Sequence, residues 1–397
     1  MNGRGGQLTR RLTSAAAFGL ASLQGVPAHA GDDAAATNMP PVAVTLDYDA
    51  ATVSDFSGGV AQSSTYIGNL HLRGLFDLDR ALGWRDTRLF VDGLWIHGGN
   101  PDAAPGDALG VNNLTAPRRA QVEELWLEHN FDGDHFSALT GLYDINTEFY
   151  RSQSGGLFLN SAFGMGTELS QSGVEGPSTF PRTSLGVRLA YKPSDNTVVR
   201  AAVLDGVPVI RPDGRVRAFE AGDGELYVAE IAWLDRPGQA MSANHRMRIG
   251  RNAMLPAYDG KFAIGAWHYT ALGASGVYAI ADRIIAHVAG DSGRTISAFA
   301  QIGAADRAAG RFTSSASLGA VAVGPFRARP NDELGVAWAT ARGSGGAEST
   351  VELTYLAQVT SSIALQPDLQ YVIHPNAQHT VPDAWVFSLR FEFSFGS

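Results

Sequence analysis

Hydrophobic and polar residues alternate along many segments of the chain. Between residues 385 and 395 every second residue is Trp, Phe or Leu, and Val, Ser, Arg, Glu and Ser stand between them. Successive side chains of a strand point to opposite faces, so this pattern predicts a strand with one apolar and one mostly polar face. The same period of two appears in residues 184–191, 227–233 and 351–357.

Weaker alternation predicts further strands, each close to ten residues long. Strands of ordinary globular proteins average about 5–6 residues, whereas a tilted strand that crosses a bilayer needs about 9–11. The total is about sixteen or seventeen strands. Besides the four segments above, they cover roughly 43–50, 65–78, 87–96, 120–130, 134–144, 196–205, 245–252, 260–270, 276–285, 294–303, 314–323, 333–341 and 362–373.

The N-terminus has the pattern of an export signal. Arg4, Arg10 and Arg11 precede an apolar stretch at 12–26, and Ala-His-Ala at 28–30 is typical of a cleavage site. The predicted organisation is a signal peptide at 1–30, a flexible lead-in at 31–41 and an outer-membrane β-barrel domain at 42–397.

Two classes of all-β protein fit the alternation. A secreted sandwich or solenoid is one, and a transmembrane antiparallel β-barrel of about sixteen strands is the other. No window holds eighteen consecutive apolar residues, as a membrane helix would. Sixteen strands give about 23 residues per strand and connection, which suits short turns on one side and longer loops on the other.

Small and aromatic residues favour the barrel. Gly and Ala are abundant on both faces of the predicted strands, which is unusual for a packed core. Aromatic residues stand near strand ends, where a membrane-interface girdle needs them. We expect this girdle to include Trp84, Trp95, Trp233, Trp267 and Tyr269.

Composition excludes several functions. The chain has no Cys, which excludes disulfides, thiolate zinc sites, iron–sulfur clusters and a cysteine nucleophile. Its net charge of -9 argues against nucleic acid as a partner. Loss of residues 1–30, which contain three Arg and no acids, would make the net charge -12. The ten His show no ligand spacing, so we expect no metal and no cofactor.

Seven segments in order resemble the carbohydrate-selective porin family, the OprB-type outer-membrane channels. The resemblance implies a sixteen-stranded barrel in the outer membrane of a Gram-negative bacterium, through which glucose and other small sugars diffuse passively. Its partners would be sugars and outer-membrane lipid, with a homo-oligomeric state, monomer or trimer, left open. One departure is the end of the chain, where Gly396 and Ser397 follow Phe395. The segments are YIGNLHLRGLFDLDRAL (66–82), GLWIHGGNP (93–101), ELWLE (124–128), GLYDINTEF (141–149), GLFLNSAFGMG (156–166), LSQSGVEGPS (169–178) and LQPDLQYVIHP (365–375).

A sugar channel needs a wet lumen whose lining exchanges hydrogen bonds with hydroxyl groups. If Leu125 and Leu127 face lipid, then Trp126 faces the lumen as a stacking platform between two carboxylates. Each charged candidate has an alternative role, pairing with a neighbour to support the barrel wall. By the same alternation, the candidates for the lumen or its constriction are Arg73, Asp92, Glu124, Trp126, Arg188, Glu230 and Arg248.

Two long irregular stretches, 97–119 and 145–181, exceed ordinary connection lengths, and such loops tend to be functional. The second contains the apolar, glycine-rich GLFLNSAFGMG and is the better candidate for a loop folded into the lumen. An external lid or a subunit contact is the alternative.

Three other functions compete with sugar diffusion. The first is a non-specific general diffusion porin, and the second is a barrel enzyme such as a lipase or protease. The third is a barrel or adhesin without a pore. The sequence contains no G-x-S-x-G, H-E-x-x-H or P-loop motif, so we do not expect an enzyme.

Overall fold

The computed structural model describes residues 41–133, 135–210, 215–235, 258–288 and 291–396. The predicted signal peptide, all but the last residue of the lead-in, the strand expected at 245–252 and the candidate Arg248 lie outside the described residues.

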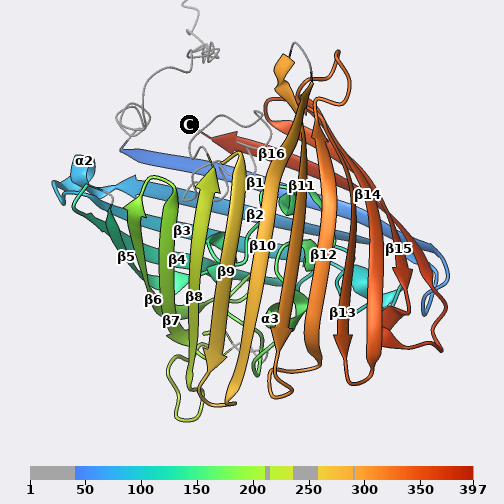
Figure 1. Ribbon diagram of the computed structural model, residues 1–397, viewed down its shortest axis with the longest axis horizontal. Helices are drawn as coiled ribbons and strands as arrows, with labels where there is room; N and C mark the ends of the chain where they lie inside the picture. Colours follow the sequence, from blue (N-terminus) through green and yellow to red (C-terminus); the bar gives the residue numbers. More distant parts are fainter. Residues whose placement is uncertain (1–40, 134, 211–214, 236–257, 289–290, 397) are drawn as a thin grey trace, which may run out of the picture. The chain divides into compact units, whose positions relative to one another are not determined.

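The described residues form sixteen antiparallel strands, and these close into a barrel because β1 pairs with both β2 and β16 (Figure 1). This confirms the predicted fold class. The strands are β1 (Val42–Ser57), β2 (Ser63–Asp77), β3 (Thr87–Gly98), β4 (Arg119–Phe131), β5 (Phe136–Tyr143), β6 (Ser184–Ser194), β7 (Thr197–Asp205), β8 (Glu225–Asp235), β9 (Gly260–Tyr269), β10 (Ala274–Val288), β11 (Asp291–Ala305), β12 (Phe312–Val323), β13 (Glu333–Gly343), β14 (Gly346–Thr360), β15 (Ile363–Ile373) and β16 (Ala384–Gly396).

The barrel wall has an apolar outer face and a largely polar inner face. On β8, Tyr227 is 45% exposed on the outside, and Glu230 is 2% exposed on the inside. A globular protein would bury the apolar face, whereas a barrel in lipid exposes it. No helix among the described residues has the length and apolar character needed to cross a membrane.

Two of the expected girdle residues do not face lipid. Trp267 and Tyr269 on β9 are only 3% and 2% exposed and point inward, so this part of the girdle prediction was wrong. The outward positions of β9 are taken by Phe262 and Ile264, which alternate with them. Trp95 on β3 is exposed, as expected.

The two long connections comprise residues 99–118 and 144–183, and both contact the inner wall of the barrel. The prediction of a loop folded into the lumen is confirmed for 144–183, here called the lumen segment, and the structure adds the loop at 99–118. The loop 99–118 contains the short helix η1 (Pro101–Ala103), and the lumen segment contains η2 (Ile145–Thr147), η3 (Gly155–Leu157), η4 (Ser161–Phe163) and α3 (Thr167–Ser170). Two other connections contain α2 (Leu78–Leu82) and η5 (Pro375–Ala377).

Wall carboxylates hold the main chain of both loops. Irregular backbone inside a barrel needs partners for its N–H groups, because it has no neighbouring strand. Glu352 on β14 accepts hydrogen bonds from the backbone N–H groups of Leu159 (2.6 Å) and Asn160 (3.0 Å). Glu348 on the same strand accepts from Ala108 in the loop 99–118.

Apolar side chains of the lumen segment pack against one side of the wall. Phe158 lies 5.8 Å from Phe299 of β11, measured between ring centroids. Gly335 on β13 makes room for this contact, because a Cβ there would lie 2.7 Å from Leu157 and 2.8 Å from Phe158. Small wall residues are therefore required where the segment approaches closely.

Candidate functional site

A β-bulge on β4 places two adjacent carboxylates inside the barrel. Asp92 of β3 pairs with Glu124, and the next residue, Gly93, pairs with Val122, so Glu123 is the extra residue. A bulge leaves its extra residue unpaired and changes which side chains point inward. Glu123 and Glu124 are consequently both buried, at 4% and 7% exposure.

Next to the bulge, ion pairs join the four neighbouring strands β1 to β4. Arg73 on β2 contacts Asp92 (2.8 Å) and Asp47 of β1 (2.5 Å). The His71 Nδ1 lies 3.0 Å from Asp92 and 3.5 Å from Glu123. Potential metal-ligand atoms of His71, Asp92 and Glu123 lie within 4.8 Å of one another. The guanidinium of Arg73 already supplies positive charge to this group, so we assign the group to ion pairing rather than to a metal site.

A second array, here called the charge belt, alternates cations and carboxylates around the inner wall from β3 to β9. Its links measure 2.9, 2.8, 2.7, 3.7, 3.9 and 3.1 Å between the nearest charged atoms. Six of its members belong to strands, and one, Glu148, belongs to the lumen segment. In order, the belt comprises Arg88, Glu128, Arg188, Glu148, Arg200, Glu230 and Lys261.

Glu148 connects the lumen segment to the belt. Burial by itself would raise the pKa of its carboxyl group, but the guanidiniums of Arg188 and Arg200 lower that pKa below its ordinary value. The carboxylate also accepts a hydrogen bond from the Tyr143 hydroxyl. Glu148 therefore stays ionised at neutral pH and holds the segment against β6.

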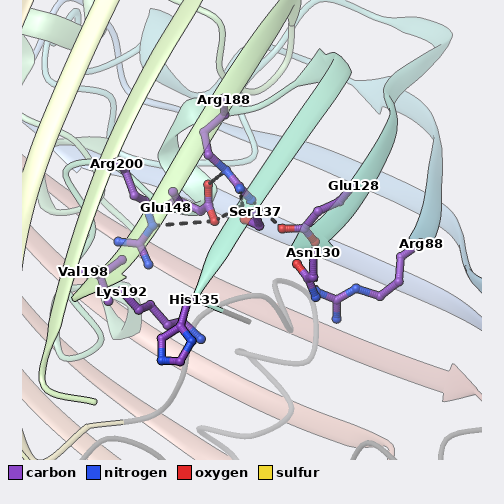
Figure 2. Close-up of a pocket in the computed structure, with 11 residues that line it drawn as sticks. Arg88, Glu128, Asn130, His135, Ser137, Glu148, Arg188, Lys192, Val198 and Arg200 are labelled. Carbon is purple, nitrogen blue, oxygen red and sulfur yellow. Dashed lines mark hydrogen bonds and ion pairs between the residues drawn. The ribbon is translucent and has the colours of Figure 1, made fainter. Parts of the chain in front are cut away.

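Two cavities lie near opposite ends of β4. The loop-end cavity, of about 280 Å³, has Arg119 and Gln121 of β4 in its lining, with Arg182 of the lumen segment. The turn-end cavity, of about 80 Å³, contains part of the charge belt (Figure 2). It is lined by Arg88, Glu128, Asn130, His135, Ser137, Glu148, Arg188, Ala190, Lys192, Val198 and Arg200.

The structure brings the described candidate residues to the inner wall, but not into one site. Arg73, Asp92 and Glu124 lie at or beside the bulge, and Arg188 and Glu230 belong to the charge belt. These last two are 1% and 2% exposed.

Trp126 also points inward, but Phe90 covers it. The two rings stack with centroids 5.0 Å apart, and the indole N–H donates to Glu124 (3.2 Å). Trp126 is 4% exposed, so its ring presents no open face in this conformation.

Sequence reasoning missed Glu148, Arg200 and Lys261. The alternation of β7 could have identified Arg200 as an inward residue, since it lies two positions from each of the buried residues Val198 and Ala202. Glu148 lies in an irregular segment, where no period indicates orientation.

Comparison with known proteins places these features in context. A family model described as carbohydrate-selective porin, OprB family, matches residues 61–273 and 270–395. Porin B of Pseudomonas aeruginosa is 20% identical, over 88% of this chain and 87% of that protein. A high-pH structure of Pseudomonas putida OprB is similar with a TM-score of 0.74 and 19% identity, over 89% of this chain and 94% of that one. The low-pH structure of that protein gives a TM-score of 0.60 at 18% identity, over 89% and 93%.

Proposed function

Because the chain belongs to the carbohydrate-selective porin (OprB) family and is a β-barrel of the bacterial outer membrane, we propose that glucose and other small sugars cross it by passive diffusion along the inner face of β4. The observation that carries the proposal is the line of polar side chains along this strand. Arg119 and Gln121 line the loop-end cavity, the two carboxylates of the bulge follow, and Glu128 lines the turn-end cavity.

The chemistry of these groups suits a neutral polyol. Carboxylates accept hydrogen bonds from hydroxyl groups, and guanidiniums donate them, so a sugar that leaves water finds replacement partners. Arg73 and Glu124 lie on opposite sides of Asp92 and would contact the permeant near the middle of the strand. The residues proposed to contact sugar are Arg73, Asp92, Glu123 and Glu124.

We further propose that transport involves no catalytic step. Passage through a water-filled channel requires only weak, exchangeable contacts, because a tight site would trap the sugar. The exposed apolar outer face, with Leu125 at 44% exposure and Val187 at 48%, is the surface that meets lipid.

The test is single-channel recording in planar bilayers. We expect stable conductance steps that millimolar glucose blocks, and a block constant about tenfold weaker in Glu124→Gln and Arg73→Gln. Arg283→Gln is the control, because Arg283 is an exposed residue paired with Asp235. Absence of conductance, together with absence of glucose-driven swelling of liposomes, would refute the sugar channel.

A further inference from the structure

Arg200 is the weakly paired member of the charge belt. Its Nε lies 3.7 Å from Glu148, and its Nη1 lies 3.9 Å from Glu230, whereas every other link of the belt is 3.1 Å or shorter. Its side chain is 5% exposed, and Nε has no hydrogen-bond partner among the residues that the structure describes. A buried donor without a partner is costly, and more so when it is charged.

The two nearest carboxylates are already engaged elsewhere. Glu148 accepts two hydrogen bonds from Arg188, at 2.7 and 3.0 Å. Glu230 accepts from the Tyr150 backbone N–H (3.0 Å) and the Tyr278 hydroxyl (2.9 Å), and its other oxygen lies 3.1 Å from the Lys261 ammonium. At each carboxylate Arg200 is therefore the more distant cation, since Arg188 lies closer to Glu148 and Lys261 lies closer to Glu230.

Arg200 lines the turn-end cavity, whose charges do not balance. The lining contains four cations and two carboxylates, a net charge of +2 with His135 neutral. Lys192 is exposed and forms no ion pair within the described part of the chain. In Figure 2, Arg200 and Lys192 lie on one side of Arg188 and Glu148, and Arg88 and Glu128 lie on the other.

We propose that the turn-end cavity is a binding site for a small oxyanion, either the carboxylate of an acidic sugar or a phosphate group. A planar guanidinium forms two parallel hydrogen bonds with such a group, and this would satisfy the unpartnered donor of Arg200. Lys192 adds a second positive charge at the edge of the site. The proposal rests on the passage along β4, which ends in this cavity.

Single-channel block of the full-length protein by glucose, gluconate and inorganic phosphate tests the proposal, together with calorimetric titration of the same ligands in detergent. We expect an anion to block and bind at least about tenfold more tightly than glucose. Arg200→Gln should reduce this preference about tenfold, and Lys192→Gln, at an exposed position, should reduce it less. Arg283→Gln, which alters an exposed charge outside the cavity, should leave it unchanged.

The outcomes separate the two ligand sources and the two proposals. Tight binding of gluconate alone indicates an acidic sugar, and tight binding of phosphate alone indicates a phosphate group. Equal block by gluconate, phosphate and glucose in the native protein overturns the oxyanion site while leaving the sugar channel intact. Tight anion binding by calorimetry without any glucose conductance overturns the sugar channel and leaves the oxyanion site.

Discussion

Arg188 Nε donates a hydrogen bond of 2.7 Å to Glu148 Oε2, and the two residues come from different parts of the fold. Arg188 belongs to β6, whereas Glu148 belongs to the lumen segment. The contact therefore attaches an irregular segment to a regular wall, and both side chains are almost completely buried.

We expect Glu148→Gln to lower stability strongly. Removing one partner of a buried pair leaves an uncompensated charge and costs about 3–5 kcal/mol. Glu175→Gln is the matched control, because its pair with Arg182 is partly exposed and worth about 0–1 kcal/mol. Thermal unfolding in detergent measures both variants, and equal midpoints would contradict the structural role of Glu148. Since the folded-state pKa of Glu148 is lowered, its ionised carboxylate stabilises the fold at pH values above its ordinary pKa of 4.5. This stabilisation is lost as the pH falls through the lowered pKa.

Enlarging Gly335 should displace the apolar part of the lumen segment. In Gly335→Leu the new side chain meets Leu157 and Phe158, and overpacking of this kind costs about 1–3 kcal/mol. We expect a larger or noisier single-channel conductance than in the native protein. Gly345→Ala serves as the control, because a Cβ there meets nothing within 4 Å. Unchanged conductance in Gly335→Leu would show that the segment does not narrow the pore.

The loop 99–118 should loosen as the pH rises. Burial, and to a smaller extent the charge of Glu348, raise the pKa of Asp102 from 3.8 to about 7. An acid with a raised folded-state pKa ionises less readily in the folded form, so the stability of the attached loop falls between about pH 4 and pH 7. The hydrogen-exchange protection of residues 99–118, which is the rate relative to the intrinsic base-catalysed rate at the same pH, should be lower at pH 8 than at pH 5. Asp102→Asn should lose most of this dependence, and a dependence equal to that of the native protein would exclude Asp102 as its origin.

Deletion of Glu123 should leave the barrel intact. Without the extra residue, Gln121 and Glu124 are still inward positions, so the strand pairs regularly and only one inward carboxylate is lost. Deletion of Val228 is the control, because β8 pairs without a bulge, so the deletion joins the outward Tyr227 directly to the outward Ala229 and reverses one half of the strand. Heat-modifiable mobility on gels reports assembly, which should persist in the first deletion and fail in the second.

Residue patterns revealed the faces of the strands but not the exceptions to the pattern. The period of two correctly placed Glu230 and Arg188 on the inner wall, since alternation is a property of the strand itself. It could not show the change of parity at Glu123, because a bulge adds a residue without any change in composition. The inward direction of Trp267 was missed for another reason, since an aromatic residue near a strand end suits both a lipid interface and a contact with a loop.

The partners of the charge belt were also beyond sequence reasoning. Glu148 and Arg188 are forty residues apart, and the position of Glu148 depends on how an irregular segment crosses the lumen. No local rule sets that path. It is determined by wall carboxylates such as Glu352, which lies 193 residues from its partner Leu159.

These distances along the chain have a consequence for the order of assembly. The lumen segment is made before β8, β10 and β14, yet its main chain is bonded to Glu230, Asp282 and Glu352 on those strands. Contacts between distant residues form late, because ordering the intervening chain costs entropy first. The attachment of the segment therefore requires these later strands to be in the sheet, so its main chain is fully fixed only near the end of barrel assembly.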